Sequence, residues 1–185
     1  QRVLDEVVEA SQGSCPARGP ETGRRATGAV RRQACDDVTV ERVERFGEYL
    51  ELLGLLLEHG ETSYSGTYYS ASGAVMNPSS LQRPRVPLVA AALGPKMMAH
   101  ASRLADTWNT MSFNPDFDAQ LSELSTRADS MDSLCAESGR DPSTLRRSAN
   151  LFDAEARGSG GRLRYYDDDE LFTRIVRTLI GAGYT

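Results

Sequence analysis

The sequence predicts an α/β fold built on a parallel sheet. From residue 86 onward, apolar strand-like runs alternate with amphipathic helical stretches in the order strand, helix, strand, helix, strand, helix. The chain has 185 residues, which suits one domain, and its longest apolar run, residues 86–93, has the length of a buried strand. Such alternation is typical of parallel strands joined by right-handed crossovers, either in a doubly wound sheet or in an arc of a barrel.

The N-terminal segment, residues 1–38, is expected to be irregular apart from a short helix at residues 3–10. Residues 14–36 contain five arginines, three glycines and two prolines, and Val30 is their only branched apolar side chain. Such a composition cannot line a core. An arginine-rich stretch could bind phosphate, but no aromatic residues are interleaved, so a solvated segment is the better interpretation. The structured domain is expected over residues 39–185.

This domain is expected to begin with a helix and a hairpin. The helix, residues 39–58, has Thr39 as its cap and Gly60 as its stop. Its apolar stripe consists of Val43, Phe46, Leu50, Leu53 and Leu57. Residues 61–69 are expected to form a small hairpin around a turn at Ser65 and Gly66, with its second strand at residues 67–69.

Three strands and three helices are expected after this hairpin. The strands are residues 86–92, a continuous apolar run typical of burial on both faces, then residues 107–110 and residues 147–153. Pro95 suits the first position of the first helix, and Asn114 and Asp167 are the expected caps of the second and third. The buried positions of the helices are expected to be Met97, Met98, Ala101, Leu104 and Ala105, then Phe117, Leu121, Leu124, Ala128, Met131 and Cys135, and finally Phe172, Ile175, Val176 and Leu179.

The turn after the first of these strands is the best candidate for a binding site. It consists of Ala91, Ala92, Leu93, Gly94, Pro95 and Lys96. Small residues let a ligand approach the backbone, amides at a helix N-terminus favour an anion such as phosphate, and Lys96 adds positive charge. An ordinary strand-to-helix turn is the alternative. Trp108 lies near the carboxyl end of the next strand, where it either faces a ligand site or packs in the core.

Other functional classes are disfavoured by the composition and the motifs. The net charge of −5 argues against a nucleic-acid partner, and no apolar run is long enough for a membrane span. The three cysteines are widely spaced, so no zinc site or disulfide framework is indicated, and a reducing cytoplasm is the expected compartment. His59 and His100 are interpreted as surface residues, the acidic run 167–170 as a helix cap, and no metal site or catalytic residue is assigned.

Three motifs in sequence order resemble the luciferase-like monooxygenases. They are the run Arg83-Pro84-Arg85-Val86-Pro87 with its apolar strand, then Gly94-Pro95-Lys96, then Ala105-Asp106-Thr107-Trp108. The helix and hairpin before them and residues 146–153 and 167–183 after them also match this family, so the resemblance covers residues 39–185. It implies a (β/α)8 barrel of which this chain is a C-terminal part, without the first strands and the last.

The resemblance also implies a redox function for the intact parent. The cofactor would be FMN or a deazaflavin coenzyme of the F420 type, used for hydride transfer or oxygenation of a small organic substrate, with homo-oligomerisation of the parent. Ala91, Ala92, Gly94, Pro95 and Lys96 would bind the cofactor, and Trp108 would line its pocket. Which cofactor, which substrate and whether oxygen is used depend on strands that the sequence does not contain.

The chain departs from the family pattern at residues 14–36, where the family has an apolar strand. Arginine, alanine, glycine and proline codons are typical of GC-rich DNA read out of frame, so this stretch is interpreted as possible out-of-frame coding. A partial barrel has open edges, and we therefore expect the chain alone to be poorly folded or aggregation-prone and inactive. The alternatives are a small α/β phosphate-binding or interaction module without catalysis, and an inactive gene remnant.

Overall fold

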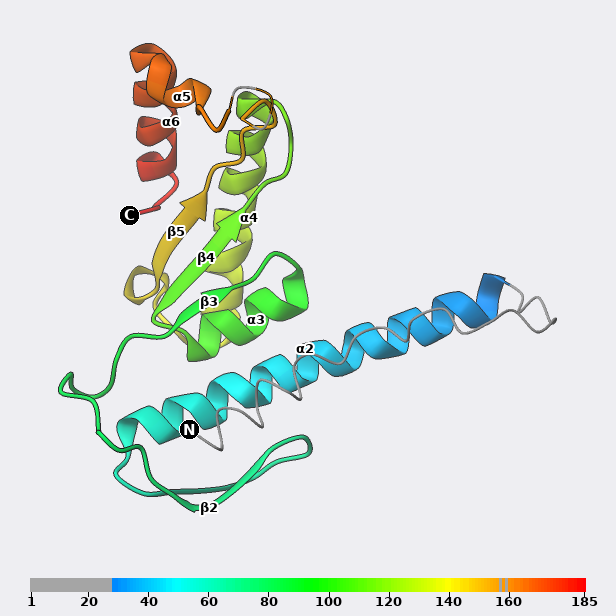
Figure 1. Ribbon diagram of the computed structural model, residues 1–185, viewed down its shortest axis with the longest axis vertical. Helices are drawn as coiled ribbons and strands as arrows, with labels where there is room; N and C mark the ends of the chain where they lie inside the picture. Colours follow the sequence, from blue (N-terminus) through cyan, green and yellow to red (C-terminus); the bar gives the residue numbers. More distant parts are fainter. Residues whose placement is uncertain (1–27, 157, 159) are drawn as a thin grey trace. The chain divides into compact units, whose positions relative to one another are not determined.

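The computed structural model describes residues 28–156, 158 and 160–185, with side chains from residue 40 onward. The chain divides into two compact units, Gln1–Asp37 and Val38–Thr185, and the second unit holds both sheets (Figure 1). The helix predicted at residues 3–10 lies outside the described residues, as do residues 14–27. The predicted α/β class is confirmed, because three parallel strands alternate with helices as in an open arc of a barrel.

The long helix α2, Gly28–Glu58, begins well before its predicted start at Thr39. Residues 28–36 are therefore helical, and the predicted irregular loop is wrong for them. Alanine, arginine and glutamine all favour a helix, and they can form one without an apolar stripe. In the second half of α2, Leu50 and Leu52 are buried, and this half of the helix lies within the Val38–Thr185 unit.

The hairpin consists of β1, Thr62–Ser65, and β2, Ser70–Ala74, which pair antiparallel. The hairpin itself is confirmed, but its second strand begins later than the predicted residues 67–69. The reason is Glu48 of α2, whose carboxylate accepts hydrogen bonds from the backbone amides of residues 67, 68 and 69 at 2.6–3.1 Å. These amides therefore bond to a side chain instead of joining the strand ladder.

The second sheet has three parallel strands in the order β3-β4-β5. They are β3, Val89–Ala91, β4, Thr107–Met111, and β5, Arg146–Asn150. Ala90 pairs with Trp108, which pairs with Arg147 on the other side. This order and direction are those of consecutive units in a parallel βα arrangement.

Strand β3 is shorter than the predicted residues 86–92, and it is not buried on both faces. Pro87 has no amide hydrogen, and the amide of Leu88 donates to the carboxylate of Asp106 at 2.6 Å, so the ladder starts only at Val89. Val89 is 63% exposed while Ala90 is 2% exposed. One face of the sheet is therefore open among the described residues.

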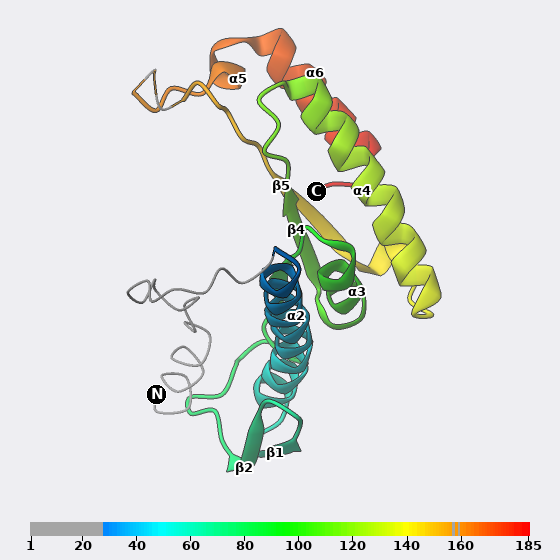
Figure 2. The same ribbon diagram turned by 90° about the vertical axis from the view of Figure 1, so that its right-hand side faces the viewer.

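Helices cover the other face of this sheet, as Figure 2 shows. They are α3, Pro95–Leu104, α4, Phe117–Glu137, and α6, Asp169–Gly181. The short elements η1, Pro142–Thr144, and α5, Arg164–Asp167, lie in the connections before β5 and α6. Adjacent helices pack in sequence order, α3 against α4 and α4 against α6, and both α3 and α4 contact β4.

Two of the predicted helix caps are wrong by one or two residues. Asp116, not Asn114, caps α4 by accepting from the amide of Ala119 at 2.8 Å. Asn114 instead accepts from the amide of Asp116 and fixes the turn before the helix. Similarly, Asp168 caps α6, because Asp167 is the last residue of α5. Neighbouring Asn and Asp residues can each cap a helix, so the sequence alone does not show which of them does.

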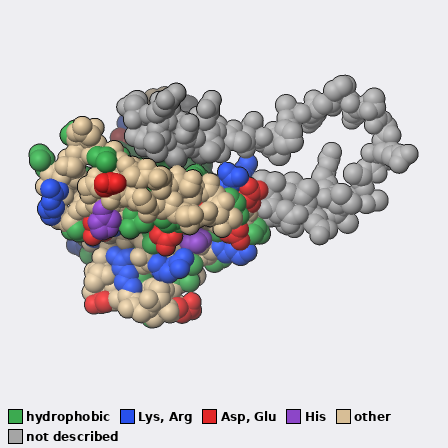
Figure 3. Space-filling view, turned by 90° about the horizontal axis from the view of Figure 1, so that it is seen from below, with side chains coloured by type: hydrophobic (Ala, Val, Ile, Leu, Met, Phe, Trp, Pro, Cys, Tyr) green, Lys and Arg blue, Asp and Glu red, His purple; other side chains and the backbone are tan. Residues whose placement is uncertain are grey.

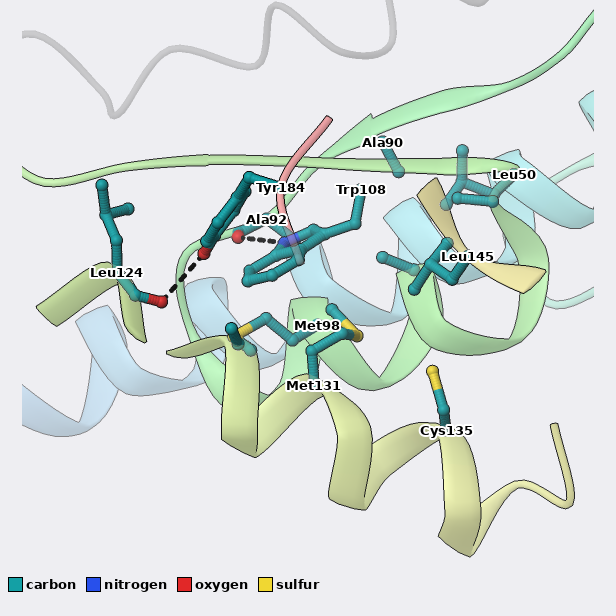
Figure 4. Close-up of a cluster of buried hydrophobic side chains, with 13 residues drawn as sticks. Leu50, Ala90, Ala92, Met98, Trp108, Leu124, Met131, Cys135, Leu145 and Tyr184 are labelled. Carbon is teal, nitrogen blue, oxygen red and sulfur yellow. Dashed lines mark hydrogen bonds between the residues drawn. The ribbon is translucent and has the colours of Figure 1, made fainter. Parts of the chain in front are cut away.

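The core lies between the sheet and its helices, and Figure 4 shows its centre. The indole of Trp108 is fully buried, and its Nε1 donates to the carbonyl of Ala92 at 2.8 Å. Tyr184, from the end of the chain, stacks at a tilt against this indole with ring centroids 6.0 Å apart. The buried positions of α3 and α4 follow the predicted stripes, with buried Met98, Ala101, Leu124, Ala128, Met131 and Cys135. In α6 Ile175 is buried as predicted, but Phe172 is 41% exposed.

The last residues of the chain attach to the outer strand of the sheet. Gly183 has a φ of +81°, which glycine adopts without strain and which directs the chain from α6 toward β5. The amide of Thr185 then donates to the carbonyl of Arg147 at 2.8 Å.

Among the described residues, no helix combines the length and apolar character needed to cross a membrane.

Candidate functional site

The turn from β3 into α3 has the features that sequence analysis expects of an anion site. Gly94 is the N-cap of α3, has an extended backbone, and makes no side-chain capping bond. Pro95 occupies the first helical turn, and Lys96 follows with an exposed side chain. A side chain added at Gly94 would meet no atom within 4 Å. The space beside Gly94 is therefore open, which leaves room for a phosphate group at this helix start.

The two alanines before this turn face opposite sides of the sheet. Ala92 is 2% exposed, its carbonyl accepts from Trp108, and its amide donates to the carbonyl of Asn109 at 3.0 Å. Ala91 instead is exposed and lies on the open face. A ligand on that face would contact Ala91, while Ala92 holds the turn in place through the core.

Trp108 does not lie where a ligand pocket would need it. Its side chain points toward the helices and is 0% exposed. The indole therefore packs in the core, which is one of the two positions expected for it, because side chains alternate along a strand and Trp108 has the parity of the core side. Its contribution is indirect, since the indole fixes the carbonyl of Ala92, two residues before Gly94.

A ladder of polar side chains occupies the open face at the carboxyl ends of β4 and β5. The amide nitrogen Nδ2 of Asn109 donates to Oγ of Ser148 at 2.8 Å. The side chain of Asn150 donates to Oδ1 of Asn109 at 3.4 Å. Ser148 and Asn150 are not among the site residues expected from the sequence. The signal was available, because polar residues at alternate positions of a strand share one face.

Two phenylalanines follow this ladder in the loops after β4 and β5. Phe113 is 63% exposed and Phe152 is half-buried. Their ring centroids are 6.0 Å apart in an edge-to-face arrangement. Phe113 continues the alternation of Asn109 and Met111, and Phe152 continues that of Ser148 and Asn150, so both rings extend the open face beyond the strands.

Charged side chains lie away from the part of the open face that is formed by the carboxyl ends of the strands. Arg146 stands at the amino end of β5, and none of the open-face residues at the carboxyl ends of the described strands is ionisable. Elsewhere, positive and negative side chains are interspersed over the described surface that Figure 3 shows. Lys96 is therefore the cation of the site at the carboxyl edge.

A second basic residue near the turn, Arg127 of α4, is already engaged. Together with Leu93 and Pro95 it lines a shallow groove of about 390 Å³ on the helix side. Its guanidinium binds the carbonyl of Met111 and pairs with Glu123 at 3.8 Å. Hydrogen bonds from Ser112 and Asn114 hold the pKa of Glu123 below its ordinary value. This group of polar residues anchors the loop after β4.

The two histidines do not take part in this site. His59 is exposed just beyond the end of α2. His100 of α3, predicted to be a surface residue, is half-buried because its ring lies against Gly47 of α2. Burial and then the neighbouring charge of Arg103 lower the pKa of His100. Among the described residues, no cluster of three or more histidine, cysteine or acidic side chains could hold a metal ion.

Consecutive parallel βα units, with candidate ligand residues at the strands' carboxyl ends, define a partial βα barrel. The model of the luciferase-like monooxygenase family matches residues 34–160 of the sequence. The chain therefore belongs to the luciferase-like monooxygenase family, as the three sequence motifs predict.

Three solved structures are similar to this chain over part of their length. A coenzyme F420-dependent tetrahydromethanopterin reductase from Methanopyrus kandleri is 24% identical, with a TM-score of 0.46 over 55% of this chain and 28% of that chain. An F420-dependent secondary alcohol dehydrogenase, in complex with an F420-acetone adduct, is 24% identical, with a TM-score of 0.45 over 70% and 34%. DmoA from Hyphomicrobium sulfonivorans is 13% identical, with a TM-score of 0.45 over 79% and 32%.

The chain thus spans about a third of the length of these solved structures. No curated protein matches the sequence.

Proposed function

We propose that the chain is part of a flavin- or deazaflavin-dependent oxidoreductase that acts on a small organic substrate. The activity, hydride transfer or oxygenation, belongs to a closed barrel to which the Val38–Thr185 unit contributes three of eight βα units. The observation that carries this proposal is the uncapped start of α3 at the carboxyl end of β3, in a member of the luciferase-like family.

The start of α3 would hold the phosphate of the cofactor. The helix amides after Gly94 and the ammonium group of Lys96 supply positive potential at one point of the carboxyl edge. Pro95 sets the first turn, and Ala91 leaves the open face free for close approach. FMN and a coenzyme of the F420 type both carry a phosphate, so this site fits either and does not choose between them.

The other residues of the carboxyl edge would position the reactants. The bound flavin or deazaflavin supplies the redox chemistry. Asn109, Ser148 and Asn150 offer hydrogen bonds on the open face beside the turn, and Ala92 and Trp108 keep that turn rigid from the core. A free thiol at Cys135, whose pKa is raised by burial, agrees with a reducing cytoplasm as the proposed compartment.

The phosphate site is tested by comparing two ligands that differ only in a phosphate group. We expect the 185-residue chain to bind FMN more tightly than riboflavin in a fluorescence titration. In Lys96→Ala the affinity for FMN should fall about two- to fivefold, the range of an exposed charge pair, while the affinity for riboflavin stays unchanged. The same comparison with coenzyme F420 and its phosphate-free deazaflavin core decides which ring is preferred.

The matched control is Arg103→Ala, which removes an exposed cation from the last turn of the same helix and should leave FMN binding unchanged. Equal loss of FMN affinity in both variants would show a general charge effect and contradict the site. If inorganic phosphate displaced FMN completely and riboflavin did not bind at all, the alternative of a phosphate-binding module without redox chemistry would replace the oxidoreductase.

A further inference from the structure

The loops after β4 and β5 present an aromatic step, which we define as Phe113 with Phe152. The two rings belong to segments 39 residues apart in sequence, yet their centroids are 6.0 Å apart. Phe113 is 63% exposed. Single exposed apolar side chains are common on protein surfaces. Here, however, buried polar side chains hold the two loops that carry the rings, and this arrangement points to a ligand.

A buried glutamine connects the two loops that carry the rings. The side chain of Gln120, 0% exposed, donates to the carbonyl of Asn114 at 2.8 Å and to the carbonyl of Phe152, and it accepts from the amide of Phe152 at 3.2 Å. A buried amide with all of these bonds holds both loops in one arrangement. The aromatic step is therefore fixed from the core side.

Glu123 fixes the loop of Phe113 from the other side. The hydroxyl of Ser112 donates to one carboxylate oxygen of Glu123 at 2.5 Å, and the amide group of Asn114 donates to the other at 3.3 Å. Phe113 lies between these two anchored residues. Its ring thus loses little further freedom when a ligand packs on it, which favours binding.

The charges and polar groups around the step indicate the chemical class of its occupant. Below the step, Met111 and Asn150 are paired in register, followed by Asn109 and Ser148, and none of these side chains is ionisable. Lys96 belongs to the turn after β3. Arg164 pairs with Asp153, the residue after Phe152, and with Glu155, so this cation is already engaged. A flat uncharged ring with one hydrogen-bonding substituent fits an aromatic edge next to amide and hydroxyl groups.

We propose that the aromatic step binds an uncharged aromatic ring of the substrate and so determines substrate specificity. This inference rests on the proposed function, because it places a substrate beside the cofactor site at the carboxyl edge. Phe113 supplies the exposed face, Phe152 supports it from the side, and the ladder of Asn109 and Asn150 orients a hydroxyl or carbonyl group on the ring.

The proposal is tested with 2-naphthol and its saturated counterpart decahydro-2-naphthol, both uncharged and both carrying one hydroxyl group. We expect saturation-transfer NMR with the 185-residue chain to show tighter binding of 2-naphthol. Phe113→Ala should weaken it about fivefold, the scale of an aromatic contact. Phe113→Leu keeps apolar bulk, so it should abolish the preference for 2-naphthol while retaining the binding of decahydro-2-naphthol.

The control is Tyr166→Ala, which removes an aromatic ring that is 68% exposed on α5 and should change neither affinity. Unchanged binding of 2-naphthol in Phe113→Ala, or an equal loss in Tyr166→Ala, would overturn the proposal. 2-Naphthyl phosphate binding more tightly than 2-naphthol in a Phe113-independent manner would assign the ring to the phosphate site instead. These ligands carry no flavin, so the result is separate from the FMN titration that tests the redox function.

Discussion

Tyr184 connects the end of the chain to the core. Its hydroxyl donates to the carbonyl of Leu124 at 2.9 Å, and the residue is 4% exposed. Burial raises the pKa of Tyr184 from 10.0 to about 12, because the phenolate would have to exist inside the core. A proton on this oxygen is therefore part of the folded state.

Tyr184 should make stability depend on alkaline pH. Its folded pKa is higher than its unfolded pKa, so its contribution is complete below pH 10 and is lost as the pH rises toward about 12. We expect Tyr184→Phe to cost roughly 1 kcal/mol at neutral pH, because the hydrogen bond is lost, and to flatten the fall in stability above pH 10. Urea unfolding followed by far-UV circular dichroism across this range measures both effects.

The comparison for this prediction is Tyr64→Phe. Tyr64 also has a pKa raised to about 12, by burial and by its bond to Glu51, but its side chain is only half-buried in the hairpin. Solvent screens its contribution, so this variant should keep most of the alkaline loss. A Tyr184→Phe curve as steep as that of the unmodified chain would contradict the role given to Tyr184.

The packing of α2 against α3 can be tested at the scale of elements. A methyl group built on Gly47 would overlap the imidazole of His100, so the glycine allows the two helices to approach. Alanine in a helix is otherwise about 1 kcal/mol better than glycine. We expect Gly47→Ala to give no stabilisation in the unmodified chain but about 1 kcal/mol in a His100→Ala background. Urea unfolding of the four proteins of this cycle measures the coupling.

Gly54 provides a control in the same helix. A methyl group there would meet Leu88 and Arg85 only at 3.9–4.0 Å, which is ordinary contact. Gly54→Ala should therefore stabilise the chain by about 1 kcal/mol whether or not His100 is present. If Gly47→Ala stabilised the unmodified chain equally, the packing of His100 against α2 would not be specific.

At the element scale, the sequence was sufficient to predict the three strands of the parallel sheet and the helices α3, α4 and α6, but not their ends, and it did not predict α5. Periodic apolar residues such as Leu121, Leu124 and Ala128 predict α4 correctly. The start of β3 depends on Asp106, which lies 18 residues away and captures the amide of Leu88. The start of β2 likewise depends on Glu48. Such long-range side-chain bonds leave no local pattern in the sequence.

The candidate site could be predicted only in its local part. Gly94, Pro95 and Lys96 follow one another, and their turn appears as predicted at the start of α3. Asn109, Ser148 and Phe152 come from two strands, and their meeting depends on the register of β4 with β5. For Trp108 the sequence leaves both a ligand site and the core open, because it does not show which face of β4 the helices cover.

At the scale of the whole molecule, the sheet has two edge strands, β3 and β5, and one open face among the described residues. Val89 lies on the edge strand β3 and is 63% exposed. Exposed edges with apolar side chains favour pairing between chains. We therefore expect the isolated chain to associate as its concentration rises and Val89→Lys to reduce this association, as measured by light scattering.

Val75→Lys is the matched control, since Val75 is 62% exposed but follows β2 of the hairpin rather than the parallel sheet. It should leave association nearly unchanged. A chain that stayed monomeric at all concentrations and melted cooperatively would contradict the expectation of an open arc that needs partner strands. Sequencing of the coding DNA tests the separate prediction that residues 14–36 are out of frame.

The contact between Trp108 and Tyr184 gives this protein an intrinsic fluorescence probe. The chain has one tryptophan, and the ring of Tyr184 lies 6.0 Å from it, so light absorbed by the tyrosine can be emitted by the indole. Detachment of the C-terminal residues would dim that transferred emission while the signal of directly excited tryptophan persists. Detachment of the C-terminal residues can thus be followed separately from unfolding of the core, without attaching any dye.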